Sequence, residues 1–150
     1  MALLIEGSER IEAPIGKVWQ GLNDPEILRA CIPGCQSLEK KSDSEMAATV
    51  VLKIGPIKAT FGGEVTLSNL KPPHSYTISG EGKGGIAGFA KGGADVTLAE
   101  DGPDATVLTY AAKADVGGKI AQLGSRLITS TSKKLAGQFF SSFGETIAKN

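Results

Sequence analysis

Residues 120–147 read IAQLGSRLITSTSKKLAGQFFSSFGETI, and their apolar positions recur at the three- and four-residue spacing of an α-helix. From Lys119 onward this spacing is sustained over about 30 residues, against a mean helix length of about 11–12. Gly124 and Gly137 each weaken such a helix by up to about 1 kcal/mol relative to alanine, so tertiary packing must help to hold it. We predict a long C-terminal helix that packs its apolar side against the rest of the chain.

The segments before this helix alternate between apolar and polar residues, which is typical of β-strands with one buried face. Residues 3–12 alternate loosely, whereas residues 46–54 and 57–67 alternate clearly on either side of the Gly55-Pro56 turn. Further strands are expected in residues 76–80, 86–99 and 105–116. Consecutive strands joined by short turns form an antiparallel meander with one apolar face.

Two short helices are predicted between the first strand and the meander. Pro14 suits the first turn of a helix of about three turns. Asn23 or Asp24 can cap the second helix, with Pro25 at its first position. Pro33-Gly34 ends it, because proline disfavours helix in the residue before it and glycine permits a left-handed turn.

Together these elements predict an α+β fold on one domain, residues 1–150. A curved antiparallel sheet of six to seven strands wraps around the long C-terminal helix, and the two short helices follow the first strand. The long helix is expected to cover the apolar face of the sheet, because no other element is long enough to do so.

Composition excludes several classes of function. Acidic and basic residues balance at 16 each and only 5% of residues are aromatic, so no nucleic-acid partner is expected. No apolar run approaches the roughly 20 residues of a membrane-spanning helix. Two cysteines are too few for a disulfide scaffold, and the apolar start is too short for a signal-peptide core. The sequence predicts a cytoplasmic protein.

Small residues crowd the strands around residue 85. Gly80, Gly82 and Gly85 match the G-x-G-x-x-G pattern, but a strand follows them instead of the helix that a dinucleotide site needs. Glycine in strands permits bends, so these residues can simply curve the sheet around a solid core. We favour the alternative that the small residues on the inner face leave a cavity under the long helix; these are Gly80, Gly88, Ala90, Gly92 and Ala94.

No catalytic or metal-binding constellation is apparent. His74 follows two prolines in a loop and is expected to be a solvated surface residue. Cys31 is expected in the core and Cys35 in a loop, without a second pair to complete a metal site. Glu9 is the exception among the carboxylates, because alternation places it on the inner face, where burial would raise its pKa and suit it to acid–base chemistry.

Three segments in combination resemble the G-subunit family of carbon monoxide dehydrogenase. They are IEAPIGKVWQGLNDPEILRACIPGC (residues 11–35), GGIAGFAKGGADVTL (84–98) and VGGKIAQLGSRLI (116–128). That family belongs to the helix-grip superfamily, which includes START lipid carriers and the birch pollen allergen. The resemblance covers essentially the whole chain, with its elements in the same order.

The resemblance implies a seven-stranded sheet around the long helix, enclosing an apolar cavity. It also implies an accessory role beside molybdenum-containing carbon monoxide dehydrogenases or related hydroxylases, with recruitment to the membrane and binding of a quinone. Relatives of this type often extend beyond the helix with a tail suited to membrane attachment, whereas this sequence ends at Asn150.

We therefore expect the protein to bind an apolar small molecule, a quinone or a lipid, with no other cofactor and no catalysis. Tyr110 and Thr131 are the candidates for holding a polar head group. Phe89 faces outward unless a bulge shifts its register. The apolar lining is expected from Leu28, Ile32, Leu52, Ile54, Phe61, Val65, Ile78, Leu108, Leu127, Leu135 and Phe139.

Two alternatives remain. Residues 118–150 carry five basic residues against Glu145, so a basic amphipathic helix could contact the inner face of a membrane or bind a partner enzyme. The stronger interpretation of that helix is that it closes the core. The other alternative is a cyclase or hydrolase acting on an apolar substrate, for which Glu9 is the one candidate acid or base.

Overall fold

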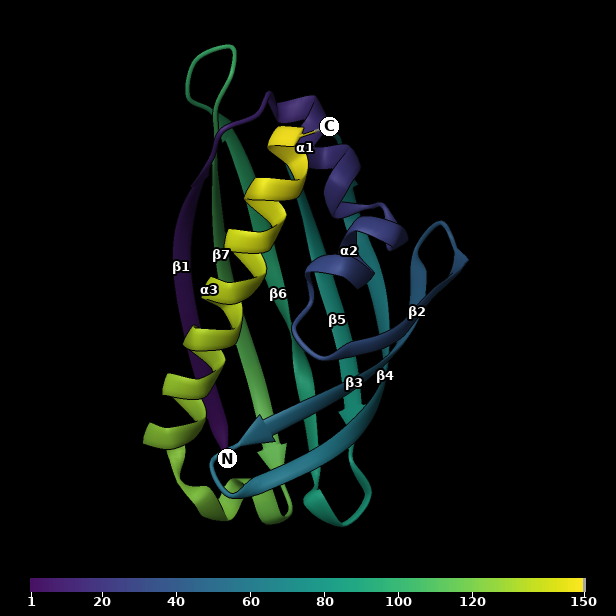
Figure 1. Ribbon diagram of the computed structural model, residues 1–150, viewed down its shortest axis with the longest axis vertical. Helices are drawn as coiled ribbons and strands as arrows, with labels where there is room; N and C mark the ends of the chain where they lie inside the picture. Colours follow the sequence, from purple (N-terminus) through teal and green to yellow (C-terminus); the bar gives the residue numbers. More distant parts are fainter. Residues whose placement is uncertain (150) are drawn as a thin grey trace.

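The computed structural model describes residues 1–149 and has one antiparallel sheet of seven strands, in the order β1-β7-β6-β5-β4-β3-β2 (Figure 1). The strands are β1 (Ala2–Ile11), β2 (Cys35–Ser42), β3 (Glu45–Ile54), β4 (Ile57–Lys71), β5 (Ser75–Lys83), β6 (Phe89–Glu100) and β7 (Thr106–Gly117). Strands that are consecutive in the sequence pair with each other from β2 through β7, and β1 pairs with β7. The predicted α+β fold is confirmed.

Two short helices, α1 (Ile15–Leu22) and α2 (Pro25–Cys31), carry the chain from one edge of the sheet to the other. The side chain of Asp24 caps α2 by accepting a hydrogen bond of 3.0 Å from the backbone N–H of Glu26. Asn23, the other predicted cap, instead donates to the carbonyl of Trp19. The first helix has eight residues, so the prediction of three turns was too long.

The long helix α3 (Ser125–Lys149) starts later than its apolar spacing predicted. Residues 119–123 form a 3-10 turn, η2 (Lys119–Leu123), and Gly124 follows with φ of +91°. Because L-residues rarely adopt this left-handed region, Gly124 separates the two helical segments instead of merely weakening one. The apolar side chains of η2 keep a helical spacing, which is why the pattern ran through the break.

The packed core forms two separate clusters at opposite ends of α3. At the upper end in Figure 1, Phe143 and Ile147 of α3 are buried against α1 and the sheet. At the lower end, Ile128 packs with Phe61 and Ile120. No residue of α3 between Ile128 and Phe143 is fully buried. The middle of the helix therefore spans a part of the sheet that it does not pack against closely.

The strand pairing and the burial of individual side chains test three further expectations. Phe89 pairs with Gly117 without a bulge and faces outward, 40% exposed, as strict alternation predicts. Glu9 lies on the inner face of β1 but remains half-exposed at the sheet edge. Cys31 is buried as expected, whereas Cys35 is the first residue of β2 and not part of a loop.

The turn between α2 and β2 depends on Gly34. This residue has φ of +75°, and its carbonyl accepts a hydrogen bond of 2.9 Å from the N–H of Val51. A Cβ at Gly34 would collide with the carbonyl oxygen of Val51, whereas a Cβ at Gly124 would meet no atom within 4 Å.

We predict that Gly34→Ala lowers the free energy of unfolding by about 3 kcal/mol, because strain at positive φ adds to a backbone collision. Gly124→Ala is the matched control, with strain alone and a loss of about 1 kcal/mol. Urea denaturation of both variants measures the difference. Equal losses would show that the contact with Val51 relaxes without penalty.

Candidate functional site

An apolar cavity of about 250 Å³ lies beneath α1 and α2, and we call it the upper cavity. Every strand except β1 contributes to its wall, because the inner-face residues of the curved sheet converge there. Its lining consists of Leu22, Leu28, Ile32, Leu38, Met46, Ala48, Val65, Leu67, Tyr76, Ile78, Val96, Leu108, Tyr110, Phe139 and Phe140.

A second apolar cavity of about 550 Å³, the lower cavity, lies between the middle of α3 and strands β3 to β6. It is lined by side chains or backbone of Ile32, Pro33, Ala48, Val50, Leu52, Ile54, Phe61, Gly63, Glu64, Val65, Gly80, Glu81, Gly82, Ala90, Ile120, Leu135, Ala136 and Phe139. The two cavities meet at the four residues that line both, namely Ile32, Ala48, Val65 and Phe139.

Most of the predicted binding residues lie on these walls. The upper cavity has Leu28, Ile78, Leu108 and Tyr110, the lower cavity has Leu52, Ile54, Phe61 and Leu135, and both have Ile32, Val65 and Phe139. The strand residues point into the cavities because alternate side chains of a strand face the inner side of the sheet. The helix residues lie there because α3 crosses over the space between the two core clusters.

Leu127 and Thr131 line neither cavity. Leu127 packs over Gly55 in the β3–β4 turn, and Thr131 lies beside Lys134 in a polar hollow at the gap between α3 and β3. The polar hollow shares Leu52 and Leu135 with the lower cavity. Thr131 therefore lies at the rim of the lower cavity.

The small residues explain why the lower cavity has room. A Cβ placed at Gly82 would meet no atom within 4 Å, so the missing side chain leaves open space. Gly80 and Ala90 line this cavity as expected, and so does Gly63, which was not among the small residues expected there. Of the other small residues expected on the wall, Gly88, Gly92 and Ala94 line neither cavity.

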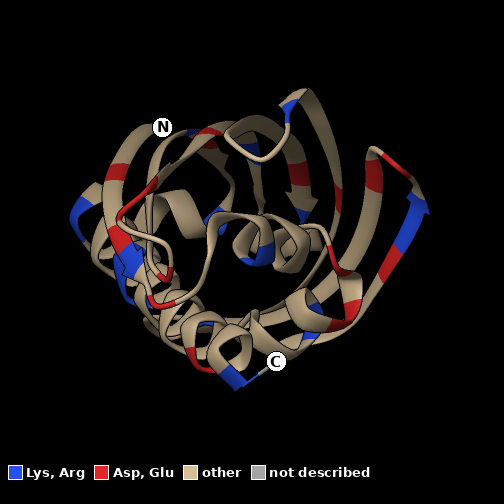
Figure 2. Cartoon of the chain, turned by 90° about the horizontal axis from the view of Figure 1, so that it is seen from above, with Lys and Arg blue, Asp and Glu red and all other residues tan. Residues whose placement is uncertain are grey.

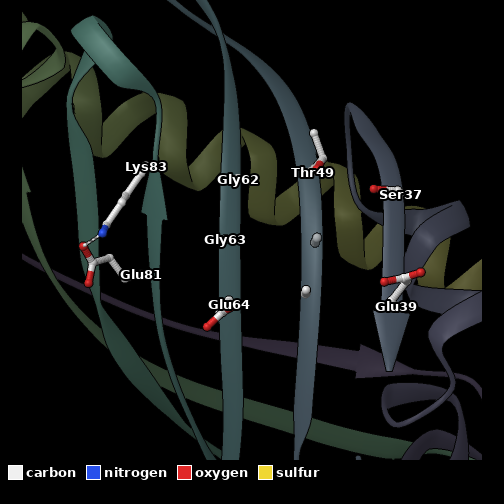
Figure 3. Close-up of a pocket in the computed structure, with 10 residues that line it drawn as sticks. Ser37, Glu39, Thr49, Gly62, Gly63, Glu64, Glu81 and Lys83 are labelled. Atoms are coloured by element: carbon white, nitrogen blue, oxygen red, sulfur yellow. Dashed lines mark ion pairs between the residues drawn. The ribbon is translucent and has the colours of Figure 1, made fainter. Parts of the chain in front are cut away.

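The same stretch of sheet is also hollow on its outer side. This outer-face hollow measures about 560 Å³. In Figure 3, Glu39, Glu64 and Glu81 lie around a floor that includes Gly62, and α3 lies on the far side of the sheet. Glu81 forms an ion pair of 3.7 Å with Lys83. Because Glu64 and Glu81 direct their side chains outward, only their backbone borders the lower cavity.

Two phenols are the polar side chains of the upper cavity. Tyr110 stacks on Phe140, and its hydroxyl lies over Gly7 of β1, so close that a Cβ there would collide with it. Tyr76 is 5% exposed and meets Trp19 edge-on at 5.4 Å between ring centroids. Burial raises the pKa of the Tyr76 phenol above its usual range, so this side chain is neutral at physiological pH.

Tyr76 was missed as a binding residue, although its alternation with Ile78 already places it on the inner face.

The remaining candidates for chemistry lie apart from both cavities. Glu9 borders a groove between β1 and α3, next to Arg10 and Glu145. His74 is exposed in the β4–β5 turn. Burial raises the pKa of the Cys35 thiol, which disfavours a reactive thiolate. Among the described residues, no group of three or more His, Cys, Asp or Glu side chains could hold a metal ion.

Residues 7–148 match the family described as the carbon monoxide dehydrogenase G subunit (CoxG). The chain belongs to this family. A crystal structure of a conserved protein from Geobacillus kaustophilus is 33% identical, with a TM-score of 0.92, and the match covers 98% of this CoxG-family chain and 96% of that one. No curated protein sequence matches the chain.

More distant structures share the fold. A START superfamily protein from Mycobacterium smegmatis has 12% identity and a TM-score of 0.74, with 97% of each chain covered. The Zhui aromatase/cyclase from Streptomyces sp. R1128 has 8% identity and a TM-score of 0.73, covering 99% of this chain and 95% of that chain. These likenesses confirm a START-like fold, and the family match confirms the resemblance seen in the sequence.

We predict that buried Tyr76 makes the CoxG-family protein sensitive to alkali. Below pH 10, the ordinary pKa of a phenol, Tyr76 keeps its proton in both the folded and the unfolded chain. The stabilising contribution of the buried Tyr76 side chain is then fully present. Above pH 10 the unfolded chain releases the proton first, which lowers the free energy of unfolding by about 1.4 kcal/mol per pH unit. Tyr76→Phe removes this component.

Urea denaturation of both proteins between about pH 9 and 11 measures the effect, because that range spans the ordinary pKa of a phenol. The wild-type curve should fall more steeply above pH 10 than that of Tyr76→Phe. Parallel curves would contradict a buried neutral phenol.

Proposed function

We propose that this protein binds an apolar small molecule, a quinone or a lipid, as an accessory protein to a molybdenum-containing carbon monoxide dehydrogenase or a related hydroxylase. The observation that carries the proposal is the pair of adjoining cavities with almost wholly apolar linings. The lower cavity, at about 550 Å³, falls within the range of about 300–1,000 Å³ that is common for ligand sites, and the adjoining upper cavity adds about 250 Å³. Membership of the CoxG family supports the choice of partner enzyme.

Hydrophobic burial would supply most of the affinity. Removing apolar ligand surface from water contributes about 25 cal/mol per Å² before the entropic costs of association. A chain-like ligand fits the arrangement best, because the two cavities meet only at a junction that includes Ala48 and Phe139. The polar rim at Thr131 and Lys134 would then lie beside the entrance.

The cavity linings favour binding over catalysis. Apart from the two phenols, the side chains that face the cavities are apolar, so they supply no acid–base pair of the kind that hydrolysis needs. Glu9, the one carboxylate expected on the inner face, borders a separate groove beyond Phe140. We therefore propose that a bound molecule leaves chemically unchanged.

Filling the junction of the cavities tests the proposed function. We predict that the purified wild-type protein releases a quinone or lipid at near-stoichiometric yield on denaturing solvent extraction, measured by mass spectrometry. Ala48→Phe puts a ring where the cavities meet and should reduce that yield at least tenfold. Because the wild type starts near saturation, such a fall requires more than a tenfold loss of affinity, that is, more than about 1.4 kcal/mol of binding free energy.

Ala47→Phe is the matched control, because Ala47 lines only the outer-face hollow. Its yield should equal that of the wild type. A wild-type protein that releases nothing, and whose melting temperature is unchanged by added quinones, would contradict the proposal.

A second candidate function, contact with an anionic membrane surface, is favoured by the lower end of the molecule in Figure 1. Three connections lie there, within residues 53–58, 83–91 and 117–126, because β3, β5 and β7 all end on that side. These segments contain no Asp or Glu and six basic residues, namely Lys53, Lys58, Lys83, Lys91, Lys119 and Arg126.

Exposed apolar side chains accompany this charge. Ile86 in the β5–β6 loop is 86% exposed, and Phe89, the first residue of β6, is 40% exposed. At the opposite end, seen in Figure 2, acidic and basic positions are interspersed. Apolar side chains next to basic ones favour anionic lipid surfaces. None of the described helices is long and apolar enough to cross a bilayer.

This location differs from the one expected on the C-terminal helix, because the apolar stripe of α3 faces the sheet. We predict that the protein floats with vesicles of anionic phosphatidylglycerol and not with neutral phosphatidylcholine. Ile86→Ser should reduce the bound fraction about threefold or more. Full burial of the isoleucine side chain contributes roughly 1.5–3 kcal/mol, and its partial insertion into the membrane surface contributes less.

Leu70→Ser is the control, because Leu70 is 42% exposed at the other end of β4. Flotation that is lost only when Lys133 and Lys134 are replaced by glutamate would place the membrane contact on the C-terminal helix. Flotation that is unchanged in Ile86→Ser would exclude a contact through Ile86.

A further inference from the structure

The hydroxyl of Tyr76 has no hydrogen-bond partner among the described residues, although the side chain is only 5% exposed. Its neighbours in the upper cavity are aliphatic and aromatic side chains, and Trp19 packs against its ring. Among the described residues, every side-chain nitrogen or oxygen without accessible surface has a partner, so the unpartnered Tyr76 hydroxyl keeps some accessible surface. Tyr76 lines the upper cavity, which is the open volume next to this side chain. Buried polar groups almost always have a partner, because an unmade hydrogen bond is unfavourable in an apolar environment. Tyr76 is therefore a polar group in need of a partner that the protein itself does not supply.

Tyr110, the other phenol of this cavity, is placed differently. It is only partly buried, and its hydroxyl lies over Gly7 of the edge strand β1. The ring of Tyr110, stacked on Phe140, forms the wall. Its hydroxyl thus belongs to the side of the cavity near β1, whereas Tyr76 lies at the end covered by α1.

We infer that the upper cavity holds the polar end of the bound molecule, and that the Tyr76 hydroxyl forms a hydrogen bond with an uncharged carbonyl or hydroxyl oxygen there. This inference rests on the proposed function and gives it a ligand class: an apolar chain or ring system ending in a neutral oxygen group. Such a ligand enters with its polar end first, and its apolar remainder passes Ala48 and Phe139 into the lower cavity.

The lining decides that this end group is neutral. Among the residues of the upper cavity none is Lys, Arg, His, Asp or Glu. A carboxylate or phosphate would lose its hydration there without meeting an opposite charge, which is strongly unfavourable. The Tyr76 phenol itself stays protonated, so it can donate to a carbonyl or accept from a hydroxyl.

Matched probes test the hydrogen bond. Octane, 2-octanone and octanoate share an alkyl chain and differ at one end in having no oxygen, a neutral oxygen or a charge. Trp19 is the one tryptophan of the chain and touches Tyr76, so its emission reports binding in the upper cavity. We titrate each probe at about pH 8, where the phenol is neutral, into wild type, Tyr76→Phe, Tyr110→Phe and Ala47→Phe, after removing bound material and checking the melting temperature of each.

The expected result is a loss of affinity for 2-octanone of about three- to tenfold in Tyr76→Phe, the usual effect of removing one hydrogen bond. Octane affinity should stay the same in that variant, and Tyr110→Phe should lose less affinity for 2-octanone than Tyr76→Phe does. Ala47→Phe, which changes only the outer-face hollow, should bind 2-octanone as the wild type does. Octanoate should bind the wild type at least about tenfold more weakly than 2-octanone, because its charge would lose hydration.

Three results would overturn the inference while leaving the proposed function intact. They are unchanged binding of 2-octanone by Tyr76→Phe, equal losses for octane and 2-octanone, and octanoate binding as tightly as the ketone. If the wild type binds neither octane nor 2-octanone, the proposed function fails and the inference fails with it.

Discussion

The structure depends on a mismatch between the width of an apolar sheet and the width of the helix that covers it. Seven strands spaced about 4.8 Å apart extend roughly 29 Å from edge to edge, whereas a helix with its side chains measures about 10–12 Å. Curving the sheet brings its two edges closer to α3 but does not make the helix wider. α1 and α2 cover part of the remainder at one end, and the cavities lie beneath the helices, where side chains do not fill the space above the sheet.

Close packing is therefore concentrated where the elements converge. Phe143 and Ile147 close one end of α3, and Ile128 closes the other with Phe61 and Ile120. Between Ile128 and Phe143 no residue of α3 is fully buried, although Phe139 and Phe140 pack against the upper cluster. This arrangement reconciles a stable fold with an unfilled interior, because hydrophobic burial at the two ends holds the cavity walls in place.

Alternation in the strands was enough to predict much of the cavity wall, because a two-residue period leaves only two orientations for each side chain. Helix phase was harder to use. Leu127, Thr131, Leu135 and Phe139 are four residues apart, and each step turns the helix by about 40° beyond a full circle. Over three steps the direction changes by about 120°, so Leu135 and Phe139 face the cavities while Leu127 and Thr131 do not.

Other features depend on contacts between distant residues and could not be predicted from local patterns. The inward register of Tyr76 was predictable, but the seal that α1 forms over it, and the absence of a partner for its hydroxyl among the described side chains, were not. Gly124 interrupts a spacing that remains helical in its apolar positions, so only its backbone conformation reveals the break. The family resemblance predicted the overall topology, which such patterns alone left at six or seven strands.

At Gly62 and Gly63 the outer-face hollow and the lower cavity lie back to back, so the wall between them is a single thickness of peptide backbone. In most sheets two layers of side chains resist bending, one on each face. At Gly62 and Gly63 neither face of β4 carries a side chain, so no packed side chain of these two residues opposes a bend. This strip therefore has fewer packed side chains to resist bending than the parts of the sheet that border the two core clusters.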